Sequence, residues 1–356
     1  MKIDNRLQKL RQRLAEEEIE AIFISQPENR YYLSGFDGSA GFLLIASQDT
    51  VLATDFRYLE QAKKQAPDYE IFQISGDIVN WFPGLVAELN LTRLGFEAKH
   101  ITFAMYRQLT DILNKAQSQL KLIPTDRLVE SLRAIKEPEE IEFITKAVEI
   151  SDSAIEYIDG IIHTGMSEKE VAWEIEKFMR ENGSEPIPFD IIVASGTNSA
   201  LPHAKPTLRT IHSGEPVIID IGARIGGYSS DLSRTICPGA PDDTFNKIYD
   251  TVLGAQLAVL SIISEGMTGE EADSLARVVI EQAGYSEAFG HGLGHGIGLA
   301  PHEQPRLGPN SPENIADGMV FTVEPGIYLS GWGGVRIEDV VVMESGKIRV
   351  ISKARK

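Results

Sequence analysis

Three carboxylates in the second half of the chain lie within apolar, β-branched runs that are typical of buried strands: Asp220 in PVIIDIGA, Glu324 in MVFTVEPG and Glu338 in GVRIEDVVVM. A fourth carboxylate, Asp231, follows in GGYSSDLSRTI. A buried, ionised carboxylate without a partner is strongly unfavourable, and Arg336 could neutralise only one of the four. Each carboxylate taken alone is explained as a residue at the end of a strand whose hydrogen bonds are satisfied. The four together predict a site for divalent cations, and we expect two of them.

A glycine-rich stretch, FGHGLGHGIGLAPHE at residues 289–303, contains His291, His295 and His302. HGLGH has the i, i+4 spacing of a helical zinc site, but no Glu follows the first histidine, and each intervening glycine costs about 1 kcal/mol in a helix. As a strand, the stretch places His291 and His295 on one face and the glycines at 292, 294, 296 and 298 on the other. We therefore predict a strand pressed against another element, with its histidines aimed into a site. The alternative for any single histidine is that it lies in the core with its hydrogen bonds satisfied and has no role in a site.

One imidazole and four carboxylates form a hard, oxygen-rich ligand set, which suits Mn²⁺ or Co²⁺ at least as well as Zn²⁺. Two such cations that share carboxylates bind and activate a water molecule. The remaining histidines and Arg336 could donate hydrogen bonds to an oxyanion. These residues predict metal-assisted hydrolysis of a carbonyl or a phosphoryl compound, and they do not choose between the two.

An internal repeat indicates how the chain brings these residues together. GMSEKEVAWEIEKFMRENG (165–183) resembles GMTGEEADSLARVVIEQAG (266–284), and each copy begins an amphipathic helix with a capping box. Three further matches follow in the same order: LPHAKP with APHEQP, GEPVIIDIG with GMVFTVEPG, and GGYSSD with GGVRIE. They pair His203 with His302, Asp220 with Glu324, and Asp231 with Glu338. We infer two similar αβ halves, related by a pseudo-twofold axis, whose paired polar residues meet at the centre.

The composition limits the class of protein. A formal net charge of −18 over 356 residues disfavours nucleic acid as a partner, because such a surface repels phosphate. The single cysteine, Cys237, allows no internal disulfide and fits a reducing cytoplasm. The charged N-terminal segment predicts a helix at 4–18 and not a signal peptide, and no apolar run approaches the ~18–20 residues of a membrane span. We expect a soluble, cytoplasmic protein that contacts no membrane.

The chain divides into two parts in its pattern of elements. Residues 1–123 alternate helix and strand signals, with short strands expected at 21–25, 42–46 and 51–55. Prolines and charges mark 124–137 as a linker, and a long helix is expected after Pro138. We therefore expect an α/β (α+β) protein with a small mixed-sheet domain at 1–123 and a catalytic domain at 138–356.

The ordered pattern DIG…SDLSRT…HGLGHGIGLAPHE…TVEPGIY…GVRIED resembles the pita-bread metallopeptidases, the superfamily of methionine aminopeptidase and prolidase. It is closest to the Xaa-Pro peptidases, prolidase and aminopeptidase P. YLSGFDGSAG is similar to the N-terminal domain of those peptidases and of creatinase. The resemblance implies a C-terminal pita-bread fold, with two pseudo-twofold-related αβ halves around a curved antiparallel sheet. It also implies a smaller, creatinase-like, mixed α/β domain before it.

The same resemblance implies a metal-binding role for five residues. Asp220 would hold one metal ion, Asp231 and Glu338 would bridge both ions, and His295 and Glu324 would complete the shell of the second. Glu324 is also the implied proton shuttle between the hydrolytic water and the leaving nitrogen. The implied cofactor is a pair of divalent metal ions, with Mn²⁺ preferred and Co²⁺ or Zn²⁺ as alternatives.

Other residues match the substrate-binding positions of the family. His203 and His302 match its two non-ligand active-site histidines, of which one would contact the leaving group and the other the oxyanion. The expected pocket residues are Phe189, Tyr228, His291 and Arg336. Where the family's SDxTRT element has Thr, this chain has Ser233, which retains the hydroxyl.

The expected activity is hydrolysis of the bond between an N-terminal residue and proline. Arg306 stands where several prolidases clamp the substrate's carboxylate, which favours an Xaa-Pro dipeptidase. The alternative is an aminopeptidase P that acts on longer peptides, and a solvated loop position is the alternative for Arg306. A creatinase-like hydrolase, a non-enzymatic binding member and a methionine aminopeptidase are weaker interpretations, because all five ligand positions are intact and an N-terminal domain is present. A homodimer is implied by resemblance.

Overall fold

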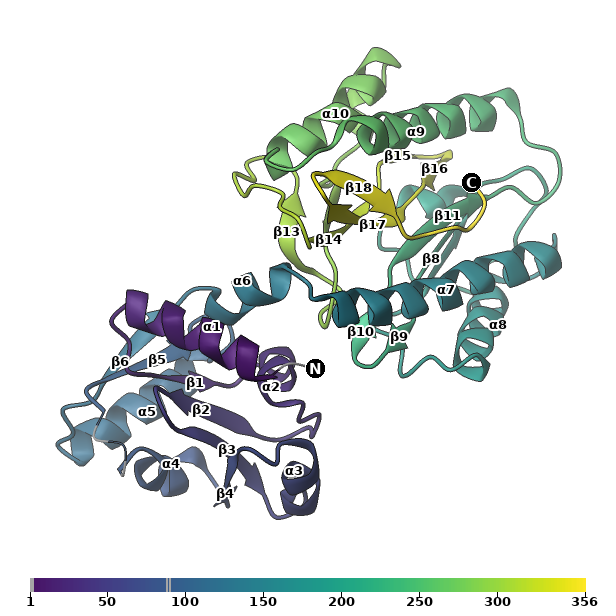
Figure 1. Ribbon diagram of the computed structural model, residues 1–356. Coiled ribbons are helices and arrows are strands. Elements are labelled where there is room, and N and C mark those ends of the chain that lie inside the picture. Colours follow the sequence, from purple (N-terminus) through teal and green to yellow (C-terminus); the bar gives the residue numbers. More distant parts are fainter. Residues whose placement is uncertain (1–2, 88, 90) are drawn as a thin grey trace. The chain divides into compact units, whose positions relative to one another are not determined.

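The computed structural model describes residues 3–356 except 88 and 90. The chain forms two compact units, Met1–Arg133 and Ala134–Lys356, each a mixture of helices and strands (Figure 1). The predicted α/β class with an N-terminal mixed domain is therefore confirmed. Within the described residues, no helix is long and apolar enough to cross a membrane.

The first unit is built on a six-stranded mixed sheet with the order β4-β3-β2-β1-β5-β6. Its strands are β1 (Ala21–Ile24), β2 (Phe42–Ala46), β3 (Thr50–Asp55), β4 (Glu70–Ile74), β5 (Arg93–Glu97) and β6 (Lys121–Thr125). The pairs β1–β2 and β2–β3 are antiparallel and the other pairs are parallel. The three strands expected at 21–25, 42–46 and 51–55 all form, each to within a residue at its ends.

Helices cover both faces of this sheet (Figure 1). They are α1 (Ile3–Glu16), α2 (Pro27–Ser34), α3 (Leu59–Gln65), α4 (Ile78–Ala87), α5 (Phe103–Lys115) and α6 (Leu128–Ala134). Helices α4 and α5 pack on one face through an apolar core that includes Phe23 and Phe82. The segment 124–137, which we expected to be a linker, contains the end of β6 and helix α6.

The second unit contains two larger antiparallel sheets, each covered by a pair of helices, and the two-stranded sheets β9–β10 and β15–β16 (Figure 1). The three-stranded sheet has the order β11-β8-β7 and packs against α7 and α8, and the five-stranded sheet has the order β13-β12-β14-β17-β18 and packs against α9 and α10. The helices are α7 (Pro138–Ile161), α8 (Glu168–Glu181), α9 (Asp243–Ile262), α10 (Gly269–Gln282) and the 3₁₀ turns η1 (Gly196–Ala200) and η2 (Ser286–Ala288). The strands are β7 (Ile192–Ser195), β8 (Val217–Ile221), β9 (Arg224–Ile225), β10 (Tyr228–Ser229), β11 (Leu232–Ile236), β12 (Gly294–Gly296), β13 (Glu303–Leu307), β14 (Val320–Val323), β15 (Gly326–Leu329), β16 (Gly333–Arg336), β17 (Asp339–Glu344) and β18 (Lys347–Val350).

The predicted internal repeat is present at the starts of α8 and α10. The hydroxyl of Ser167 accepts from the backbone N–H of Glu170, and the Glu170 carboxylate accepts from the backbone N–H of Ser167. Thr268 and Glu271 make the same reciprocal pair. Each capped helix follows a long helix and precedes an antiparallel strand pair, β8–β11 or β14–β17. The second unit therefore consists of two similar αβ halves, as the repeat predicted.

The two halves meet at a seam between β11 and residues 336–339. The backbone N–H of Glu338 donates to the carbonyl of Ser233 at 3.1 Å. The hydroxyl of Thr235 donates to the carbonyl of Arg336 and accepts from its N–H. The predicted curved sheet therefore takes the form of separate hydrogen-bonded sheets, and contacts that include these join the two halves.

Candidate active site

Strand register brings the four carboxylates to the seam between the halves. Asp220 lies near the end of β8, and the pairing of Ile221 with Leu232 places Asp231, just before β11, beside the end of β8. The pairing of Val323 with Asp339 likewise places Glu324, just after β14, beside Glu338, just before β17. Two equivalent strand pairs thus present two acidic residues each to one centre.

Three of the predicted metal ligands converge on one point. Asp231, His295 and Glu338 each offer a ligand atom, and these atoms all lie within 4.8 Å of one another. Nε2 of His295 is 3.6 Å from Asp231 Oδ2 and 3.3 Å from Glu324 Oε1. Nδ1 of His295 faces the carbonyl of Gly296 at 3.1 Å, so Nδ1 carries the proton and Nε2 presents its lone pair to the carboxylates. This is the tautomer that a metal ligand requires.

The buried carboxylates of the site repel one another, and added positive charge would stabilise their ionised forms. Burial, followed by the charges of Glu338 and Asp220, raises the pKa of Asp231 well above its ordinary value. Burial, followed by the charges of Glu324 and Asp220, does the same to the pKa of Glu338. Burial raises the pKa of Glu324 to about 8, although Arg336 opposes the shift. Bound divalent cations would remove this repulsion and keep the carboxylates ionised.

Asp220 supplies a second sign of a cation site. Its Oδ2 accepts from Nη2 of Arg336 at 2.6 Å. Its Oδ1 is buried and has no hydrogen-bond partner among the described residues. Buried polar atoms are almost always satisfied, so this atom lacks a partner that a divalent cation would provide. The residues of the site therefore fit a metal group with oxygen and nitrogen ligands.

Arg336 is the centre of a buried hydrogen-bond network. Its Nε donates to the hydroxyl of Ser233 at 2.8 Å, and that hydroxyl donates to Glu338 at 2.9 Å. Its Nη1 donates at 2.9 Å to the hydroxyl of Tyr328, which lies 2.9 Å from Nε2 of His291. Burial lowers the pKa of His291 to about 4, so its neutral ring accepts from Tyr328. The network fixes the orientation of Arg336 and of one predicted pocket histidine.

Sequence reasoning missed Tyr328. It stands four residues after Glu324 and pairs across β15–β16 with Gly334, whose Cα faces the ring so closely that an added Cβ would lie 2.8 Å from it. The signal that could have pointed to Tyr328 was the pairing of a tyrosine with a glycine on the neighbouring strand, which leaves room for the ring. Burial raises the pKa of Tyr328 to about 12, so its hydroxyl keeps its proton.

The glycine-rich stretch packs as predicted but over a shorter strand. A Cβ on Gly294 would lie 2.1 Å from the carbonyl oxygen of Thr322, and one on Gly296 would lie 2.0 Å from that of Gln304. The glycine face is therefore pressed against β14 on one side and β13 on the other. Regular strand is limited to Gly294–Gly296, because the register with β13 shifts after His295. The expectation of a continuous strand was wrong for that reason.

The two predicted non-ligand histidines lie in exposed loops. The ring of His302 lies 4.0 Å, centroid to centroid, from that of His295. Burial lowers the pKa of His302, the charge of Asp220 opposes that shift, and the charge of His203 adds to it. His203 therefore lies within electrostatic range of His302, and its catalytic role stays a prediction.

The remaining pocket residues lie in different surroundings. Phe189 packs against the end of β8, where a Cβ on Gly222 would lie 2.6 Å from its ring. Tyr228 is buried, and its hydroxyl donates to Glu140 at 2.7 Å. Arg306 is exposed, and its Nη1 donates to the carbonyl of Pro309 and the hydroxyl of Ser311. Phe189 thus lies beside the strand that carries Asp220, whereas these hydrogen bonds direct the other two side chains to residues outside the predicted ligand set.

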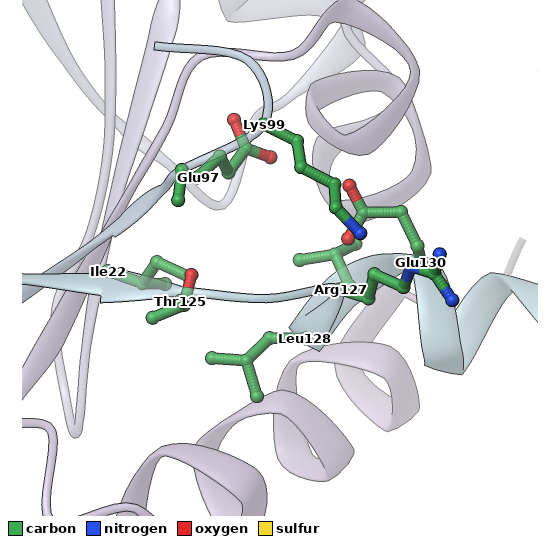
Figure 2. Close-up of a pocket in the computed structure, with 9 residues that line it drawn as sticks. Ile22, Glu97, Lys99, Thr125, Arg127, Leu128 and Glu130 are labelled. Atoms are coloured by element: carbon green, nitrogen blue, oxygen red, sulfur yellow. The ribbon is translucent and has the colours of Figure 1, made fainter.

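A small cavity lies elsewhere, in the first unit, at the carboxyl ends of β5 and β6 (Figure 2). Its lining includes Ile22, Glu97, Thr125 and Leu128. A volume of about 10 Å³ holds about one water molecule. This cavity is too small for a peptide, and none of the predicted site residues lies in the first unit.

Comparison with known proteins gives two family matches. Residues 142–345 match the model of metallopeptidase family M24, and residues 6–135 match that of the creatinase/prolidase N-terminal domain. The chain is 38% identical to the Xaa-Pro dipeptidase of Pyrococcus furiosus, covering 98% of both chains. Its structure is similar to an Xaa-Pro dipeptidase from Bacillus anthracis, with a TM-score of 0.94, 44% identity, and 99% of this chain and 98% of that one covered. It is also similar to an X-Pro aminopeptidase from Thermotoga maritima, with a TM-score of 0.90, 37% identity and 98% of each chain covered.

Proposed function

The chain belongs to metallopeptidase family M24, and we propose that it hydrolyses the bond between an N-terminal residue and proline, with Xaa-Pro dipeptides as its substrates. The observation that carries the proposal is the convergence of Asp231, His295 and Glu338 within 4.8 Å, beside Glu324 and Asp220. These five residues would hold two divalent metal ions, which we propose to be Mn²⁺, with Co²⁺ or Zn²⁺ as alternatives. When bound, the ions would supply Lewis-acid chemistry to the scissile carbonyl and the hydrolytic water.

The protein's own residues would move the proton and hold the substrate. Glu324 would take a proton from the water and deliver it to the proline nitrogen as the C–N bond breaks. Thr322 donates to Glu324 Oε1 at 3.2 Å and so orients that carboxylate. His203 and His302 would hydrogen-bond the leaving group and the oxyanion. An Xaa-Pro bond has no N–H to donate, so recognition of proline would depend on apolar contact, for which Phe189 is the candidate.

The preference for dipeptides rests on Arg306. Its exposed guanidinium could bind the free carboxylate of a dipeptide if it exchanged its present contacts with Pro309 and Ser311. The names of similar proteins include both a dipeptidase and an aminopeptidase, so action on longer peptides is the second candidate. We also propose a homodimer and, from the single cysteine, a cytoplasmic location.

The test is to remove metal with a chelator and to restore Mn²⁺, Co²⁺ or Zn²⁺ separately. Release of the N-terminal residue is then followed for Ala-Pro and Ala-Pro-Ala, with Ala-Ala as control. Metal-dependent cleavage of Ala-Pro alone is the expected result, and Arg306→Ala should then raise KM. Equal or faster cleavage of the tripeptide would assign the aminopeptidase activity. Absence of cleavage with every metal would refute the peptidase proposal.

A further inference from the structure

Glu168 is a fully buried carboxylate outside the metal cluster, at the start of helix α8. Its Oε1 accepts from the N–H and the hydroxyl of Ser195, both at 2.8 Å, and from Nδ2 of Asn198 at 3.0 Å. Its Oε2 accepts from the N–H of Thr207 at 2.9 Å and from its hydroxyl at 2.6 Å. Five donor groups therefore converge on one side chain that the proposed reaction does not use.

These donors lie at the two ends of a single loop. Ser195 and Asn198 stand at its beginning and Thr207 at its end, and His203 lies between them. We propose that Glu168 is a positioning residue, which closes the base of the loop 195–207 and thereby places His203 in the active site. This inference rests on the proposed function, because it assigns Glu168 a role through one of its catalytic histidines.

A second contact holds the same loop from the side of the metal cluster. Nη1 of Arg336 donates to the carbonyl of Pro202, the residue before His203, at 3.2 Å. The loop is therefore held at its base by Glu168 and near its tip by Arg336, which also binds Asp220. Loss of the base contacts would leave His203 free to move relative to the carboxylates, although Arg336 would remain in place.

The chemistry of Glu168 fits a permanent structural charge. Burial raises the pKa of Glu168, but the hydrogen bonds from Thr207 and Ser195 outweigh it and hold the pKa below its ordinary value. The carboxylate is therefore ionised, and charged acceptors make stronger hydrogen bonds than neutral ones. The positive end of the α8 dipole favours the same charge.

In the second half of the repeat, the segment after the histidine is held against its capped helix by a different contact. Gly269 occupies the place of Glu168, and a Cβ there would lie 2.1 Å from the carbonyl oxygen of Arg306. The segment after His302 thus packs directly on the start of α10, whereas the segment after His203 is held at a distance by a side chain. Helix α10 is capped without a carboxylate at this position. The carboxylate of Glu168 is therefore explained by the loop that carries His203 and not by the needs of a capped helix.

The experiment compares Glu168→Gln with Glu170→Gln, its neighbour in the same helical turn. The Glu170 carboxylate accepts from the backbone and the hydroxyl of Ser167 to complete the capping box, so its variant controls for helix stability and dipole. With Mn²⁺ and Ala-Pro, we expect Glu168→Gln to lower kcat/KM by between about ten- and a hundredfold, as displacement of a catalytic group does. Glu170→Gln should stay near wild type, and the metal content of both should be unchanged.

A double-mutant cycle with His203→Ala separates positioning from general destabilisation. If Glu168 acts through His203, Glu168→Gln should change kcat/KM by less than about twofold in the His203→Ala background. Additive losses, or wild-type activity in Glu168→Gln, would overturn the proposal. Hydrogen exchange gives a readout that does not depend on catalysis: amides of 198–207 should exchange faster in Glu168→Gln than in Glu170→Gln. Unchanged exchange would refute positioning, whereas an inactive wild type with faster exchange in Glu168→Gln would refute the peptidase function alone.

Discussion

Removal of metal should reverse the usual dependence of stability on pH. In the metal-free folded protein, burial raises the pKa of Glu324 to about 8 from an ordinary value of 4.5. Between these two values the folded state holds a proton that the unfolded state has lost. The free energy of unfolding must then fall as pH rises, by about 1.4 kcal/mol per pH unit for one such group. Asp231 and Glu338, whose pKa values are also raised, add to the fall.

The assay is urea unfolding of chelated protein at four pH values between 5 and 8, followed by circular dichroism. Glu324→Gln removes one of the raised groups, so its slope against pH should be shallower than that of wild type by about 1.4 kcal/mol per unit. Glu344→Gln is the matched control. The hydrogen bond from Arg349 lowers the pKa of Glu344, so this carboxylate is ionised in the folded state throughout the window and largely ionised in the unfolded state, and its loss should hardly change the slope.

Saturating Mn²⁺ should restore stability that rises with pH, because cations bind only to the deprotonated ligands. The reasoning would be refuted by equal slopes in wild type and Glu324→Gln. It would also be refuted by a chelated protein that becomes steadily more stable between pH 5 and 8.

Further variants test the hydrogen bonds and close packing around the site. Ser233→Ala should lower kcat/KM for Ala-Pro by about two to four orders of magnitude, since it removes two bonds to charged groups worth about 1.5–3 kcal/mol each, whereas Ser233→Thr should stay near wild type. Tyr328→Phe should lower kcat/KM about fivefold, the equivalent of roughly 1 kcal/mol; an unchanged value would mean that the network is dispensable. Gly294→Ala should lower Tm and metal content, because its Cβ would lie 2.1 Å from an oxygen of Thr322. Gly254→Ala, a helical position with nothing within 4 Å, should instead stabilise by about 0.5–1 kcal/mol.

The features predictable from sequence were those with a local cause. Capping boxes depend on residues three apart, so Ser167–Glu170 and Thr268–Glu271 are recognisable in the amino-acid sequence itself. Short apolar runs such as AIFIS and FLLIA located the first strands of the N-terminal unit for the same reason. The end of β12 was not predictable, because it depends on a register shift against β13, a partner that the local pattern does not specify.

The residues of the site also divide into those that the sequence predicted and those that it did not. The acidic residues were recognised because carboxylates are rare in buried strands, and such an exception is informative. Tyr328 and Glu168 belong to residue types that are common at their positions, since a strand accommodates tyrosine and the first turn of a helix favours glutamate. Their importance comes from partners 37 residues away in the case of His291 and 39 in the case of Thr207. Only the folded arrangement brings those partners together.

The repeat pairs its acidic residues and its histidines but leaves Arg336 without a basic counterpart, and this asymmetry accounts for the charge of the site. Alignment of GGYSSD with GGVRIE places Ser229 opposite Arg336. Ser229 is buried, and its hydroxyl has no hydrogen-bond partner among the described residues. A second arginine at 229 would pair with another carboxylate and replace the positive charge that metal ions bring. Because only one half carries the arginine, a single guanidinium faces four carboxylates, and the unbalanced negative charge is what divalent cations would neutralise.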